Sequence, residues 1–154
     1  MIDMSIALGL HVLAAVIWVG GMAFAYAFVR PAAGALEGPA RQMLWRGVFA
    51  RFFPVVWACV IVLLASGYYM LFAGHGGFAD AGPHVHLMQA LGILMMLIFA
   101  HVYMAPWRRF RRAVDAGDRQ AGARNIEQIR RFVAINLVIG LLVVVIASSG
   151  RYWA

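Results

Sequence analysis

The sequence lacks lysine, has a single cysteine, and contains six acidic residues among 154. The lone Cys59 excludes an intrachain disulfide and a CxxC metal site. All six Asp and Glu residues fall outside the apolar runs, which argues against a transporter driven by carboxylates within the membrane. A Walker loop and a nucleophile–base constellation are also absent, so the sequence offers no signature of an NTPase or a triad hydrolase.

Apolar residues dominate the composition, at 64% hydrophobic against 12% charged, with a mean hydropathy of +0.83. A soluble domain of this length could not bury so much apolar surface, whereas a bilayer accepts it. Crossing about 30 Å of hydrocarbon takes about 20 helical residues, and four runs meet that length, at about 6–29, 52–73, 86–106 and 131–150. We therefore predict an all-α integral membrane protein, a four-transmembrane-helix bundle forming one domain over residues 1–154.

The net charge of +7 comes from arginines that lie in the breaks between the apolar runs. This placement indicates membrane topology rather than nucleic-acid binding. The first and third connections are arginine-rich and are expected in the cytoplasm, which puts both termini outside, in the periplasm if the membrane is a bacterial inner (plasma) membrane. Residues 41–52 and 119–130 are expected to extend the second and fourth helices, and Pro106 to end the third.

His11 lies about five residues inside the first span, where an ionisable side chain is costly unless it faces the bundle interior and has a partner. At about 100° per residue, its face carries mostly small residues around two large ones. These are Ala15, Trp18, Met22 and Ala25, flanked by Ala14 and Gly21. Such a stripe leaves room for a flat cofactor, and it is also expected of an ordinary helix-packing seam.

The third span has histidines at both ends, His84 and His86 at its start and His101 near its close. With each span centred in the membrane, His11 lies about 10 Å and His86 about 14 Å above the midplane, and His101 about 8 Å below it. His11 and His86 can therefore approach one cofactor near the outer face. His84 and His86 could instead chelate copper or zinc from an extended loop, or be solvated.

A second candidate polar site pairs His101 with Asn136, which lies at similar depth, about 7 Å below the midplane. A structural hydrogen bond between the two helices is the simpler interpretation. Methionines in the spans are potential soft copper ligands, although such residues usually serve packing.

The order of these features resembles CopD-type copper-resistance membrane domains and the related HemJ-type protoporphyrinogen oxidases, small four-helix membrane proteins that bind haem b. The resemblance begins with His11-x6-Trp18-Val-Gly-Gly21 running to Arg30-Pro31 and covers nearly the whole chain. Its later parts are Gly67 in the second span, the segment from His84 to His101, and Arg131-Phe-Val-Ala-Ile-Asn136.

The resemblance implies that His11 is a haem axial ligand packed by the stripe containing Trp18. His86 stands where the HemJ-type enzymes carry a lysine, and because imidazole can ligate iron, a bis-histidine haem with His11 and His86 is implied. Such a haem is six-coordinate and suited to electron transfer. Leu137 replaces the glutamate that follows the asparagine in those enzymes, a departure that bears on the porphyrinogen-oxidising chemistry.

We therefore expect a membrane haem b protein with a redox role near the outer face, either in electron transfer or as a haem-dependent oxidoreductase. Expected partners are the lipid bilayer, a quinone or another small redox substrate, and a second copy of the chain in a homo-oligomer. One alternative is copper binding or transport of the CopD type through His75, His84 and His86, with Met88 as a further ligand. The other is protoporphyrinogen oxidase activity.

Overall fold

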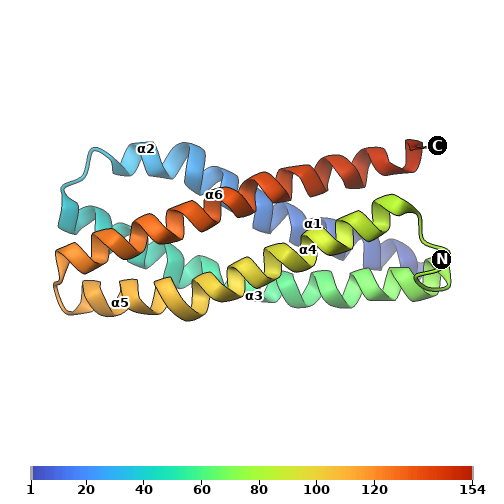
Figure 1. Ribbon diagram of the computed structural model, residues 1–154, viewed down its shortest axis with the longest axis horizontal. Helices are drawn as coiled ribbons and strands as arrows, with labels where there is room; N and C mark the ends of the chain where they lie inside the picture. Colours follow the sequence, from blue (N-terminus) through green and yellow to red (C-terminus); the bar gives the residue numbers. More distant parts are fainter. Residues whose placement is uncertain (1, 154) are drawn as a thin grey trace.

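The computed structural model describes residues 2–153 and, over those residues, consists of helices and their connections without strands (Figure 1). Four continuous helical segments are long and apolar enough to cross a membrane. They cover Asp3–Ala33, Gly38–His75, Pro83–Asp115 and Arg119–Ser149. The prediction of an all-α bundle with four membrane-spanning helices is confirmed, and the protein is an integral membrane protein.

Two of the four segments contain a wider π-helical turn. The first runs as α1 (Ile2–Phe24), η1 (Ala25–Val29) and α2 (Arg30–Ala33), and the second is α3 (Gly38–His75). The third comprises α4 (Pro83–Val102), η2 (Tyr103–Trp107) and α5 (Arg108–Asp115). The fourth is α6 (Arg119–Ser149), which ends in a 3-10 turn, η3 (Gly150–Tyr152).

The helix boundaries follow local chemistry. α3 and α4 begin with a proline in the first turn, where its missing N–H costs nothing. The Asp118 carboxylate caps α6 by accepting a hydrogen bond from the backbone N–H of Ala121 at 2.9 Å. α3 ends at Gly76, whose φ of 74° is a left-handed conformation that favours glycine.

Pro106 corrects the prediction that the third helix ends there. It lies inside the π turn η2, and the chain continues as helix into α5. Proline has no N–H to donate, and a wider turn is a common way for a helix to accommodate that loss without breaking. The third membrane helix is therefore longer at this end than the sequence indicated.

The helices extend past the membrane at one end of the bundle. The 38 residues of α3 correspond to about 57 Å, against about 30 Å of hydrocarbon. The predicted extensions over 41–52 and 119–130 are confirmed as parts of α3 and α6. There Arg46 donates two hydrogen bonds to the Asp115 carboxylate, at 2.7 and 3.0 Å, and joins α3 to α5.

α1 begins and α6 ends at the same end of the bundle, which we call the terminal end (Figure 1). The opposite end, formed by α2, α5 and the starts of α3 and α6, carries most of the arginines and is called the arginine-rich end. α1 packs chiefly on α3, and α4 packs chiefly on α6. By the positive-inside rule the arginine-rich end is predicted to be cytoplasmic.

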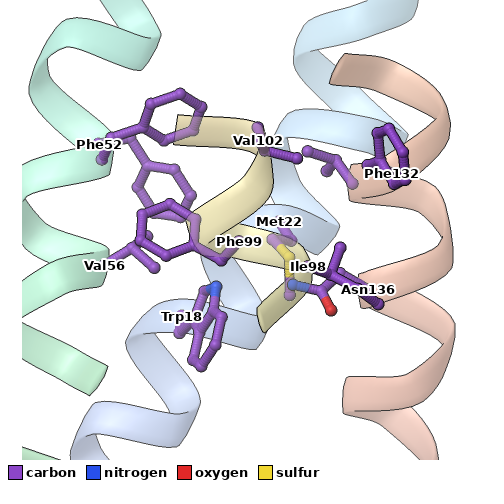
Figure 2. A pocket seen from close by; sticks show the side chains of 11 residues that line it. Trp18, Met22, Phe52, Val56, Ile98, Phe99, Val102, Phe132 and Asn136 are labelled. Carbon is purple, nitrogen blue, oxygen red and sulfur yellow. The ribbon is translucent and has the colours of Figure 1, made fainter. Parts of the chain in front are cut away.

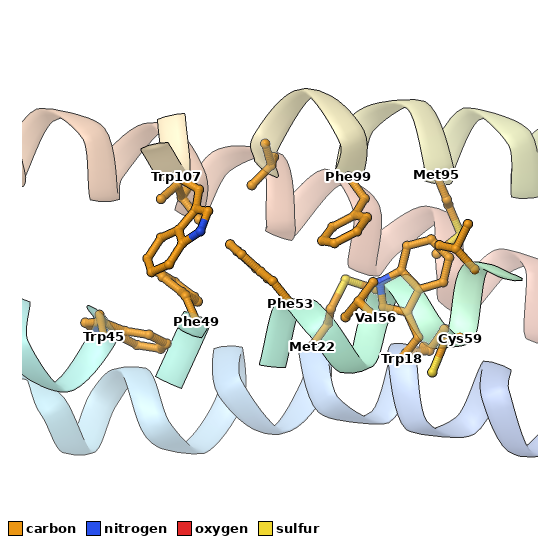
Figure 3. Packing of buried hydrophobic residues seen from close by; sticks show 14 of the residues in the cluster. Trp18, Met22, Trp45, Phe49, Phe53, Val56, Cys59, Met95, Phe99 and Trp107 are labelled. Carbon is orange, nitrogen blue, oxygen red and sulfur yellow. The ribbon is translucent and has the colours of Figure 1, made fainter. Parts of the chain in front are cut away.

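The interior toward the arginine-rich end is filled by aromatic rings (Figure 3). Neighbouring ring centroids there lie 5.1 to 6.3 Å apart, mostly edge to face. We call this group the aromatic column; it consists of Trp45, Phe49, Phe53, Trp57, Phe99, Tyr103, Trp107 and Phe110. Such pairs add packing energy beyond the area they bury, so the aromatic column stabilises this half of the bundle.

Candidate functional site

The half of the bundle toward the terminal end contains a large cavity between α1, α3, α4 and α6. Its cavity volume is about 270 Å³, and it is partly open to the outside. This volume is just below the roughly 300–1,000 Å³ of typical small-molecule sites. The lining residues are His11, Ala15, Trp18, Val19, Leu63, Leu64, Gly67, Tyr68, Met70, Leu71, His75, Val85, Met88, Gln89, Gly92, Ile93, Met95, Met96, Gly140, Val143 and Val144.

His11 is half-buried and lines the large cavity from α1. Its Nδ1 lies 2.9 Å from the hydroxyl oxygen of Ser66 on α3. Ser66 is itself buried, and the next residue, Gly67, also lines the cavity. The partners that the sequence demanded for a histidine in the membrane therefore lie on α3: the Ser66 hydroxyl and, beside it, the backbone of Leu63.

Four methionines also line the large cavity: Met70, Met88, Met95 and Met96. Met104, in contrast, is exposed on the bundle surface. Thioether sulfur is a soft ligand that suits Cu(I) and can also ligate haem iron. The cavity thus combines the imidazoles of His11 and His75 with several sulfur atoms.

Polar groups in the cavity lining are few. The amide of Gln89 donates a hydrogen bond to the hydroxyl of Tyr68 at 3.1 Å, which joins α4 to α3. The exposed His75 has its Nδ1 3.5 Å from the carbonyl oxygen of Met70. The remaining walls are mainly aliphatic, so the site suits a largely apolar guest with a few polar atoms.

The structure brings together some of the residues predicted to bind a cofactor and separates others. Trp18 lines the large cavity with His11, whereas Gly21 does not. A Cβ on Gly21 would overlap the ring of Phe52, so this glycine allows α1 to approach α3 closely. The ring of the exposed His86 lies against Phe78, with centroids 6.5 Å apart, and is not part of the lining.

The outer histidines do not meet at one point. His84 packs against Gly150 at the end of α6, where a Cβ would overlap its side chain. His86 lies on Phe78, and His75 ends α3. Within residues 2–153, no three His, Cys, Asp or Glu side chains are grouped closely enough to hold a metal ion.

The predicted pair of buried polar residues is corrected by the structure. Asn136 is buried, but its amide nitrogen donates to the backbone carbonyl of Met95 at 3.2 Å rather than to His101. His101 is exposed on the outer surface of the bundle, and its ring contacts Phe132 at a centroid distance of 5.0 Å. The two residues lie at similar depth along their helices, but His101 is on an exposed face of its helix and Asn136 is on a buried face.

Asn136 lines a second, much smaller cavity of about 20 Å³, beside Trp18, Met22 and Phe99 (Figure 2). Its amide oxygen is buried and has no hydrogen-bond partner in the described part of the chain. Trp18 lines both cavities and thus stands between them. Asn136 is therefore a separate buried polar group, which lines the smaller cavity and not the large one.

Ser66 is the contact that sequence reasoning missed. A small hydroxyl within an apolar run is common in membrane helices, where it often bonds to its own backbone. The available signal was the pair Ser66-Gly67, because the glycine offers space beside a polar side chain. Recognising it needed the register between α1 and α3, which one sequence does not provide.

Comparison with known families gives one match. The family model for copper resistance protein D (CopD) matches residues 46–149. This range includes the membrane part of α3 and all of α4, α5 and α6, and it lies beyond α1 and His11. Comparisons with curated proteins and with solved structures gave no match. The likeness to the HemJ-type enzymes stays a prediction. Because the match covers more than half of its length, the chain belongs to the copper resistance protein D family.

Proposed function

We propose that the large cavity binds haem b with His11 as an axial ligand, and that the protein has a redox role near the terminal end of the bundle. The observation that carries this proposal is the imidazole of His11 on the wall of a mainly apolar space between four membrane helices. A bare metal ion would need little of that space, whereas a macrocycle needs both the space and the ligand.

The lining fits a flat porphyrin in several respects. Gly67, Gly92 and Gly140 remove side chains from three of the four helices, and a Cβ on Gly92 would meet only open space. Long aliphatic side chains supply the apolar walls. No lining residue carries a fixed positive charge, so propionate groups would depend on the open part of the cavity and on Tyr68, His75 and Gln89.

When bound, haem supplies a one-electron couple at its iron. The protein's contribution is then to hold the iron through His11, to exclude water with the aliphatic walls, and to tune the environment. Trp18 closes the cavity on the side facing the aromatic column. Electron exchange with a quinone or another small redox partner would occur from the side that is open to the outside.

There are two sets of candidates for the second axial ligand, and experiment can distinguish them. The sequence predicts His86, whose ring lies on Phe78 at the start of α4. On the same helix, Met88 and Met96 belong to the cavity lining. A histidine–methionine pair raises the haem reduction potential relative to two histidines. The spectrum of the reduced protein and the reduction potential of the haem therefore distinguish these ligand sets.

The deciding experiment is haem and metal quantitation on detergent-purified protein, with reduced-minus-oxidised spectra of the wild type and of His11→Ala, His86→Ala and His84→Ala. We expect a haem b spectrum that His11→Ala abolishes and His84→Ala leaves intact. His84 is the matched control, because it is an outer histidine packed on Gly150. A protein that is free of haem after reconstitution, or that keeps its spectrum without His11, would overturn the proposal.

Copper handling is the second candidate, and family membership supports it. The supporting observation is that four thioethers and the imidazoles of His11 and His75 line one cavity, a set of donors that suits Cu(I). The copper ligands proposed here are therefore the cavity methionines rather than His84 and His86, which do not line the cavity. We expect Cu(I) binding, measured against a competing chelator, to fall in the double variant Met88→Leu/Met96→Leu and to persist in His84→Ala/His86→Ala.

A further inference from the structure

We infer that Ser66 is a positioning residue that holds His11 in the tautomer protonated at Nδ1, so that the Nε2 lone pair is free for a ligand in the large cavity. The inference rests on the proposed function for the identity of the ligand, but the tautomer itself is a property of the ligand-free protein. It follows from three contacts, one within α3 and two between α1 and α3.

The first two contacts involve the Ser66 hydroxyl. Its oxygen lies 2.5 Å from the backbone carbonyl oxygen of Val62, one turn earlier in α3. It also lies 2.9 Å from Nδ1 of His11. Ser66 is buried, and its single proton must therefore be assigned to one of these two neighbours.

The proton belongs between Ser66 and Val62. A carbonyl oxygen cannot donate, so two oxygens 2.5 Å apart require the hydroxyl proton between them. With its proton directed to Val62, the Ser66 oxygen can act toward His11 only as an acceptor. His11 must then donate from Nδ1, and a neutral ring protonated at Nδ1 carries its lone pair on Nε2.

Gly67 provides the third contact. A Cβ on this residue would lie 3.2 Å from Cε1 of His11 and 3.6 Å from its Nδ1. The absent side chain lets this edge of the imidazole approach α3 closely enough to reach Ser66. Val62, Ser66 and Gly67 thus form one cradle along α3, and His11 enters it from α1.

A hydrogen bond on the second nitrogen is the usual way in which a protein orients a ligating histidine and raises its basicity. Removing such a partner typically lowers metal affinity by about 10- to 100-fold. The cradle therefore predisposes His11 to bind a metal centre, whether haem iron or Cu(I), before any ligand arrives.

The direct test is ¹⁵N NMR of histidine-labelled, ligand-free protein in detergent, in mildly alkaline buffer where imidazole is neutral. The His11 resonances are those absent from His11→Ala. We expect a protonated Nδ1 and an unprotonated Nε2. A wild-type ring protonated at Nε2 would overturn the inference, irrespective of any result with haem or copper.

The variant series tests the role of the hydroxyl. Ser66→Ala should give a mixture of tautomers and about tenfold or greater loss of haemin or Cu(I) affinity, whereas Ser66→Thr keeps the hydroxyl and should restore the Nδ1 tautomer. The control is Ser148→Ala, because Ser148 makes the same kind of bond to its own helix, to Val144 and Val145, on the exposed side of α6. Unchanged tautomer and affinity in Ser66→Ala would overturn the inference.

The proposed function and the positioning role of Ser66 can fail independently of each other. A wild-type protein that shows the expected tautomer but binds neither haemin nor Cu(I) contradicts the proposed function and leaves the positioning role of Ser66 supported. A protein that binds haemin through His11 but has the opposite tautomer supports the proposed function and contradicts the positioning role of Ser66.

Discussion

Replacing Gly67 with alanine should weaken ligand binding without destabilising the bundle. The new Cβ would lie 3.2 Å from Cε1 of His11, so the ring must move by a few tenths of an ångström. This movement lengthens the 2.9 Å bond between His11 Nδ1 and Ser66. Weakening one neutral hydrogen bond costs about 0.5–1.5 kcal/mol, which is roughly a two- to tenfold loss of affinity.

The stability of the ligand-free protein should change little, because two effects oppose each other. Alanine in place of glycine in the interior of α3 favours the helix by up to about 1 kcal/mol, and the weakened His11–Ser66 bond offsets that gain. The two quantities are measured on one preparation, by titration with haemin or Cu(I) and by thermal unfolding of the ligand-free protein. A loss of affinity with little change in stability is the expected result.

Gly20→Ala is the matched control. Gly20 is also in a helix interior, in α1, and a Cβ there meets no atom within 4 Å. It should gain stability, because no contact opposes the new methyl group, and it should keep its affinity. The reasoning is refuted if Gly67→Ala binds as tightly as the wild type, or if Gly20→Ala loses as much affinity as Gly67→Ala.

Three further predictions follow from the packing and the orientation. Gly92→Phe should fill the large cavity and abolish ligand binding in absorption titrations; retained binding would show that the ligand lies elsewhere. Phe53→Ala removes a ring from the middle of the aromatic column and should lower the free energy of unfolding in micelles by about 3–5 kcal/mol; a loss below about 1 kcal/mol would contradict the column's role. With Cys59 replaced by alanine, Ala79→Cys should react in intact cells with a membrane-impermeant maleimide and Ala116→Cys should not. The reverse pattern would overturn the predicted orientation.

The sequence predicted the membrane spans well because a bilayer imposes a simple length requirement on apolar runs. It also predicted the extensions of α3 and α6, since helical periodicity continues beyond the apolar core. It failed at Pro106, where the rule that proline ends a helix competes with a π turn. A local sequence rule cannot anticipate that packing of α5 on α6 favours a continued helix.

The candidate site was only partly predictable. His11 was found because an ionisable group in a membrane span is conspicuous, and the structure places it in the wall of the large cavity. His86 was assigned to the same site from its depth and from the family resemblance, and neither determines which way a side chain projects at the start of α4. Ser66 was invisible for the same reason, because its contact with His11 depends on how α1 and α3 align.

The contrast between the aromatic column and the large cavity has a consequence for assembly. The column ties α3 to the third membrane helix through contacts that need no ligand, so the arginine-rich half of the chain can fold as soon as the helices are inserted. In the terminal half, the large cavity then remains between the helices, lined in part by glycines and methionines. Backbone amides of the ligand-free protein are expected to exchange slowest beside the column and faster around the cavity. The proposed cofactor would then enter a membrane bundle whose arginine-rich half has already folded.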